Sequence, residues 1–234
     1  MTITTRAGKG SELTHGEVDT NFIDLRDGVN AQLPKVKGGG GIKVGDDGSA
    51  TYPWQDLVPP IQVYGEVGDA TRATLVGGLK ALQFAESDSA YLDFFVPHDH
   101  ANNTDIYINV HWSHNGTLVT GGSVTWAAEF TYSKAHNQGA FPASSTISVV
   151  SPASTISLQH MTAEVLGSSP GGSATTVPTE DLEPGVISIA RIYLDSNDMT
   201  VSGGGVPDPF LHGVTLHYQS ATVGTKNKSP DFWA

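Results

Sequence analysis

The chain has 234 residues, of which 38% are hydrophobic and 15% are charged, so we expect one sizeable β domain with a small appendage. Cysteine is absent, which excludes disulfides, thiolate metal sites and cysteine nucleophiles. The formal charge of -12 disfavours binding to nucleic-acid phosphates, and the lack of a long apolar run argues against insertion into a membrane.

A helix is predicted near the N-terminus, in an attachment segment that we place at residues 1–35. Thr14 precedes Glu17 by three positions, the spacing at which a hydroxyl and a carboxylate cap each other's backbone N–H groups. The apolar residues that follow have the spacing of a coiled-coil seam: Val18, Phe22, Leu25 and Val29. A helix this short is marginal alone, so it must pack on sister chains, on its own body or on another structure. The glycine run at 38–41 favours packing on other chains, because it separates the helix from the body.

Residues 36–60 are predicted to form a linker with a hairpin. Two short alternating segments flank Asp47-Gly48, a pair typical of hairpin turns. Pro59-Pro60 then marks a boundary with the body.

The body, residues 61–234, reads as a β-sandwich or jelly roll, because short segments rich in β-branched and aromatic residues alternate with turn signals. The predicted strands are 91–96, 105–112, 123–132, 146–150, 155–160, 185–194 and 213–219, and 75–84 also favours a strand. The predicted turns are at 114–116, 121–122, 195–198 and 203–205. Alternation within one strand predicts a shared core face for Trp126, Ala128, Phe130 and Tyr132.

Two kinds of position have side chains that could bind a metal ion: a pair of histidines and two groups of acidic residues. His98 and His100 are weak candidate ligands, because alternate residues of an extended segment point to the same side. Their neighbours, Pro97 and 101–103, instead favour an exposed loop in which these histidines are ordinary polar residues. The acidic pairs at 46–47 and 195–198 suit calcium, but hairpin turns favour the same residues for backbone reasons. We therefore expect no metal and no cofactor.

Catalysis is not expected either. The chain contains neither Gly-x-Ser-x-Gly nor His-Glu-x-x-His. Carboxylates that would have to converge for glycoside cleavage are Glu129, Glu164, Glu180 and Glu183. Among the aromatic residues, the better candidates for contact are Trp54 and Trp233, which are predicted in irregular segments. If the chain is a binding module, its contact surfaces would be the loops at 97–105, 133–145 and 167–183.

The string at 13–25 resembles the start of many phage tail-fibre and virion proteins. Their pattern is Leu-Thr, two variable positions, Glu-Val-Asp, one variable position and Asn-Phe, with Leu three residues after the Phe, and all of these are present. The strings at 217–220 and 224–232 are similar to the endings of small phage structural proteins whose body is similar to a trimeric jelly roll.

This resemblance implies location and assembly, and it supplies no catalytic motif. It implies a phage virion structural protein made in the bacterial cytoplasm. The expected form is a homotrimeric fibre, spike or decoration component, held to other virion proteins of the capsid or tail by residues 1–35. The alternative is a receptor- or carbohydrate-binding module of a tail fibre, which would contact a host surface glycan.

Overall fold

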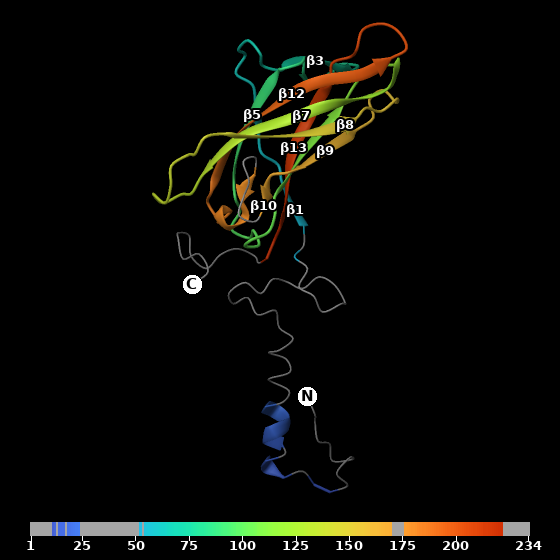
Figure 1. Cartoon of the computed structure of the whole chain (residues 1–234). Helices are drawn as coiled ribbons and strands as arrows, with labels where there is room; N and C mark the ends of the chain where they lie inside the picture. Colours follow the sequence, from blue (N-terminus) through green and yellow to red (C-terminus); the bar gives the residue numbers. More distant parts are fainter. Residues whose placement is uncertain are drawn as a thin grey trace.

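The computed structural model describes residues 11–12, 14–16, 18–23, 52, 54–169 and 176–221. Their strands form two sheets packed face to face, so the predicted β-sandwich class is confirmed (Figure 1). Sheet 1 consists, in order, of β3 (Thr71–Val76), β4 (Leu79–Gln83), β13 (Phe210–Gln219), β6 (Tyr107–Ser113) and β9 (Met161–Leu166), and β1 (Trp54–Leu57) also pairs with β13. Sheet 2 consists of β2 (Ile61–Gln62), β5 (Ser89–Phe95), β12 (Ile187–Val201), β7 (Val119–Ser133) and β8 (Ser145–Pro152).

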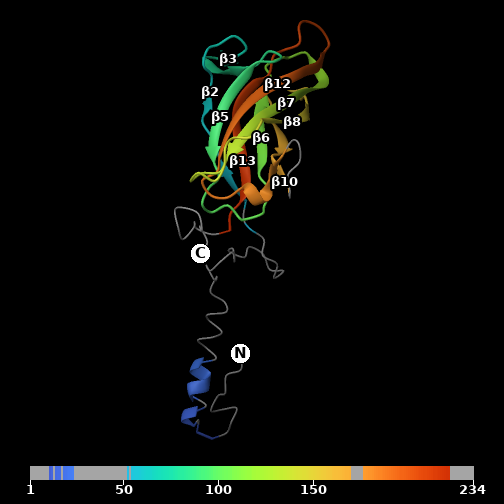
Figure 2. The same ribbon diagram turned by 60° about the vertical axis from the view of Figure 1, so that its left-hand side comes forward.

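Consecutive strands repeatedly cross from one sheet to the other, as in a jelly roll. The chain passes from β5 in sheet 2 to β6 in sheet 1 and back to β7, and it later passes from β12 to β13 (Figure 2). A small parallel pair, β10 (Ser168–Ser169) with β11 (Val177–Pro178), and the 3-10 turn η1 (Thr179–Asp181) lie between β9 and β12. Apart from the consecutive pairs β3–β4 and β7–β8, neighbouring strands of the two sheets are therefore distant in sequence.

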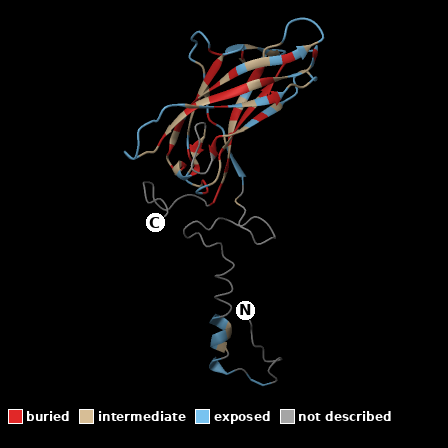
Figure 3. Ribbon diagram, viewed as in Figure 1, coloured by how far each residue is buried: buried red, intermediate tan, exposed pale blue. Residues whose placement is uncertain are grey.

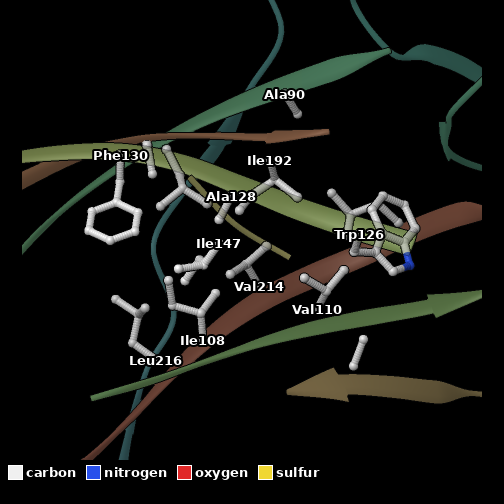
Figure 4. Close-up of a cluster of buried hydrophobic side chains, with 14 of the residues drawn as sticks. Ala90, Ile108, Val110, Trp126, Ala128, Phe130, Ile147, Ile192, Val214 and Leu216 are labelled. Carbon is white, nitrogen blue, oxygen red and sulfur yellow. The ribbon is translucent and has the colours of Figure 1, made fainter. Parts of the chain in front are cut away.

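The core fills the space between the two sheets, where most buried residues lie (Figure 3). Sheet 1 contributes Ile108, Val110, Val214 and Leu216, and sheet 2 contributes Ala90, Trp126, Ala128, Phe130, Ile147 and Ile192 (Figure 4). The predicted core face of β7 is confirmed: three of its members are buried and Tyr132 packs against the cluster. Because strand side chains alternate, every second residue of β6 and β13 is left on the outer face of sheet 1.

Several local predictions differ from the structure. The segment 155–160 is a turn region, and the strand is the next segment, β9. The predicted turns at 195–198 and 121–122 lie inside β12 and β7, which pair with each other through two register shifts. Gly122 has a φ of 86°, and a Cβ there would clash with the Asp198 carbonyl oxygen, so only glycine fits this position, which is close to the register shift between Gly121 and Val119. The segment 75–84 is strand, divided by a turn at 77–78 into β3 and β4.

The N-terminal part agrees with the predicted helix where it is described. Residues 15, 16 and 18–23 are helical, and the Thr14 carbonyl oxygen accepts the Val18 N–H at 3.1 Å. Phe22 of the predicted seam is 67% exposed. Glu17, Leu25, Val29 and the predicted hairpin following residue 41 lie outside the described residues, apart from Tyr52. No helix in the described part of the chain has the length and apolar character needed to cross a bilayer.

Candidate carbohydrate-contact face on sheet 1

The outer face of sheet 1 carries polar and aromatic side chains in register across four strands. In one row, Asp56 of β1 and Tyr107 of β6 are both paired with His217 of β13. In the next row, Asn109 of β6 is paired with Thr215 of β13 and with Glu164 of β9. Trp54 of β1, which is paired with Gln219, is the seventh residue of this face. We call these seven residues the sheet 1 platform: Trp54, Asp56, Tyr107, Asn109, Glu164, Thr215 and His217.

Asn109 is the centre of the hydrogen bonds that order the platform. Its amide nitrogen donates to Glu164 Oε2 at 3.1 Å and lies 2.8 Å from His217 Nδ1. The two N–H groups of the amide suit these two acceptors, which leaves His217 Nε2 to donate to Asp56 Oδ1 at 2.9 Å. Asn109 is 3% exposed, so it supports the exposed Glu164 and the partly exposed His217 from beneath the face. Both carboxylates are thereby fixed in position with acceptor capacity remaining.

Two aromatic residues form the other part of the platform. Trp54 is 53% exposed, and its ring meets the Tyr107 ring edge-on with centroids 5.7 Å apart. A surface pocket of about 600 Å³, a volume that includes its open mouth, is lined by Trp54, Tyr107, Glu164 and His217. An exposed indole beside fixed carboxylates can contact an apolar ring face while the carboxylates accept hydrogen bonds from hydroxyl groups.

Three histidines extend the face beyond the platform, and we call them the histidine row: His111, His160 and His212. His111 Nδ1 lies 3.0 Å from His160 Nε2, and His111 Nε2 lies 3.0 Å from the Thr215 hydroxyl of the platform. The His212 ring meets that of His160 edge-on at 6.2 Å.

The histidines of the row influence one another's protonation. Burial lowers the pKa of His111, and the nearby His160 and His217 lower it further, against an opposing effect of Asp56. Burial likewise lowers the pKa of His212, with His160 and His111 acting in the same direction. The rings of His111 and His212 are therefore favoured in their uncharged form at neutral pH.

The structure separates the two histidines that the sequence offered as metal ligands. His98 is exposed, whereas His100 is 1% exposed, so the predicted exposed loop is wrong for His100. The reason is non-local: His100 bridges to Ser220, and the Ala101 N–H donates to the Gln219 carbonyl, which brings the loop against the end of β13. Among the described residues, no three His, Asp or Glu side chains are placed to share a metal ion.

Asp99 serves this junction and not a ligand. It accepts hydrogen bonds from the Tyr218 hydroxyl at 3.1 Å and from the Ser220 hydroxyl at 2.8 Å. Burial, together with the charge and hydrogen bond of Asp99, raises the pKa of Tyr218 to about 12. The carboxylate thus holds the end of β13 to the loop at 97–105.

The other predicted contact and acidic residues are divided between the two sheets. Glu129 forms an ion pair with Arg191 at 3.0 Å on the outer face of sheet 2, so it does not converge with Glu164 of sheet 1. Trp54 does reach a candidate site, although it lies in strand β1 and not in an irregular segment. Trp233 lies outside the described residues.

Sequence reasoning missed most of the residues around Trp54, although it named Glu164 as a carboxylate that glycoside cleavage could use. Polar residues alternate with buried aliphatic ones in β6 and again in β13, and this pattern could have assigned Tyr107, Asn109, Thr215 and His217 to one outer face. The pairing of β1, β13, β6 and β9 that brings them together has no local signal.

No family model matches this chain, and no curated protein matches it. Among solved structures, similarity is found to a Clostridium thermocellum xylanase 10B fragment that comprises CBM22-1 and GH10 modules in complex with xylohexaose, with 15% identity, a TM-score of 0.31, and 74% of this chain and 27% of that chain covered. The xylan-binding module CBM15 has 7% identity and a TM-score of 0.36, and the match covers 74% of this chain and 100% of that module. CBM35 from Cellvibrio japonicus Abf62 has 13% identity, a TM-score of 0.26, and 71% and 98% covered. This chain thus spans about a quarter of the first of these.

Proposed function

We propose that this chain is a carbohydrate-binding module whose ligand lies across the sheet 1 platform. The observation that carries the proposal is the half-exposed Trp54 standing beside a fixed set of hydrogen-bonding groups. Sugar rings present apolar C–H faces together with hydroxyl groups that both donate and accept hydrogen bonds. The indole and the carboxylates of the platform complement those two features.

The shape of the platform also suits an extended ligand. Together with His111 of the histidine row, its rows run from the pair Trp54–Gln219 to the pair His111–Gly213, six residues along β13. At a strand rise of about 3.3 Å per residue this is roughly 20 Å, enough for several consecutive sugar units. An open sheet face of this length favours the interior of a glycan chain over a single monosaccharide.

A paired substitution tests this proposal. Replacing Trp54 and Tyr107 together by alanine is expected to weaken glycan binding by about 100-fold or more, because it removes the stacking surface and leaves the core untouched. The measurement is binding of the full chain to an array of immobilised oligosaccharides and polysaccharides, followed by calorimetric titration of the strongest ligand.

The matched control is Tyr64→Ala. Tyr64 is also an exposed aromatic residue, but it packs against Tyr91 of sheet 2, on the other layer of the sandwich. This variant is expected to bind as the unaltered chain does. Equal loss of binding in the two variants, or none in the double variant, would contradict the proposed location.

A second proposal concerns where the module works. The motif at 13–25 and the exposure of Phe22 support a homotrimeric virion component that is held on a phage particle by residues 1–35. An apolar seam on a short helix is stabilised when neighbouring chains cover it. In this setting the sheet 1 platform would meet a host surface glycan.

Removing residues 1–35 tests the attachment role. The shortened chain is expected to keep its β-sandwich, because β1 to β13 all lie after residue 35, and to be absent from purified particles. Circular dichroism reports the fold, and immunoblotting of particles reports incorporation. Incorporation of the shortened chain at the normal level would rule out this attachment segment.

A further inference from the structure

We infer that the sheet 1 platform selects glycans that lack acidic groups, an inference that rests on the proposed carbohydrate-binding function. The charged side chains of the platform are the carboxylates Asp56 and Glu164, both exposed. His217 lies between them, with Nε2 2.9 Å from Asp56 and Nδ1 3.6 Å from Glu164. A carboxylate, sulfate or phosphate on the ligand would therefore approach two groups of its own sign.

Each described arginine or lysine either forms an ion pair or lies on strands β3 and β4, outside the platform. Lys134 pairs with Asp181 at 2.8 Å, and Arg191 pairs with Glu129 on sheet 2. Arg72 and Lys80 lie on β3 and β4, a hairpin that meets β13 at Phe210 and Leu211.

That hairpin is far from the aromatic end of the platform. Leu211 precedes Gln219, the residue paired with Trp54, by eight positions along β13. Eight residues of strand span roughly 26 Å, which is well beyond the screening length of about 8 Å at physiological salt. Thr215, at the other end of the platform, is four positions from Leu211, or roughly 13 Å. Within the described residues, no arginine or lysine therefore lies near the aromatic end of the platform to compensate an acidic ligand.

The two carboxylates have a positive use with an uncharged ligand. Asn109 and His217 hold them by one oxygen each, Glu164 Oε2 and Asp56 Oδ1. Each carboxylate keeps further acceptor sites that can receive hydrogen bonds from neighbouring sugar hydroxyls. Acidic sugars would gain the same hydroxyl contacts but would add charge repulsion, so the carboxylates act as the discriminating groups.

The experiment compares matched glycans on one array: neutral and amino-sugar chains beside sialylated, sulfated and uronic-acid forms of the same backbones. The full chain is expected to bind the acidic forms at least about tenfold more weakly than the neutral ones. Raising the salt concentration from about 50 mM to about 500 mM is expected to change neutral-glycan binding by less than about twofold, because no ion pair with the ligand is involved.

Two variants at one exposed position make the test specific. Glu164→Lys is expected to raise the affinity for the acidic glycans by about tenfold. Glu164→Gln keeps the size and an acceptor oxygen, so it is expected to narrow the difference in affinity between neutral and acidic glycans without reversing the preference. Thermal melting of both variants confirms that they are folded.

The outcomes separate the inference from the proposed function. Preference of the unaltered chain for acidic glycans, lost in the Trp54→Ala, Tyr107→Ala variant, would overturn the inference and leave the binding face in place. Absence of binding to every glycan class would overturn both. Preference for glycans without acidic groups, reversed by Glu164→Lys, supports both.

Discussion

Replacing Trp126 by alanine is expected to lower the free energy of unfolding by about 3–5 kcal/mol, the range for large-to-small changes of buried tryptophan. Trp126 is 1% exposed and lies between the sheets, with its ring 5.2 Å from that of Phe84 and 6.5 Å from that of Trp112 (Figure 4). Its removal leaves a cavity that the two sheets cannot close, because each is held by its own hydrogen bonds. Urea unfolding followed by circular dichroism measures the change.

Two controls accompany this variant. Trp126→Phe keeps an aromatic ring in the same space and is expected to lower the free energy of unfolding clearly less than Trp126→Ala does. Trp54→Ala removes the same side chain from an exposed position and is expected to alter stability by less than about 1 kcal/mol. A loss below about 1 kcal/mol for Trp126→Ala would mean that the core is not packed around this residue.

Lowering the pH from 7 to 5 is expected to destabilise the fold. Burial lowers the pKa of His100, against opposing effects of the Leu182 and Thr104 backbone and of Asp99, and burial also lowers the pKa values of His111 and His212. Above pH 6.5 these histidines are neutral in both the folded and the unfolded chain, so they give the free energy of unfolding no dependence on pH. Below that pH these histidines become protonated in the unfolded chain but stay neutral in the folded chain. The free energy of unfolding therefore falls as the pH is lowered, until the pH reaches the folded-state pKa values.

His100 is expected to contribute most, with a slope of up to about 1.4 kcal/mol per pH unit, while His111 and His212 contribute less because solvent screens them. The measurement is urea unfolding at a series of pH values for the unaltered chain and for His100→Gln. The variant is expected to show a shallower dependence. His98→Gln, two residues away and exposed, is the matched control and is expected to retain the full slope. Equal slopes for the unaltered chain and His100→Gln would contradict the role of His100.

The sandwich fold could be predicted from the sequence because its strands carry a strong local pattern. The alternation of Trp126, Ala128 and Phe130 fixes both the strand and its buried face, and the structure places all three in the core. Where pairing partners overrule local composition, prediction failed. Asp195 and Asp198 have the chemistry of a turn, yet both lie inside β12: Asp198 is paired with Ser123 of β7, and Asp195 lies at a register shift between the two strands.

The candidate site was only partly predictable. Trp54 was singled out because it was predicted in an irregular segment, but its companions Tyr107 and His217 come from strands that are distant in sequence. His100 shows the opposite error. Its neighbours Pro97, Asn102 and Asn103 indicate an exposed loop, but a bridge to Ser220, 120 positions later in the chain, buries it. Neither contact leaves a trace in the local sequence.

The position of β13 has a consequence for the life of the chain in the cell. The last described strand to be synthesised lies in the middle of sheet 1, between β6 and the pair β1 and β4, and the previous long strand lies in the middle of sheet 2. A ribosome must therefore release nearly all of the body before either layer can close, and earlier strands wait with unpaired edges. We therefore expect the sandwich to close only after β13 has left the ribosome, and we expect this closure to be slow because its pairings join distant parts of the sequence.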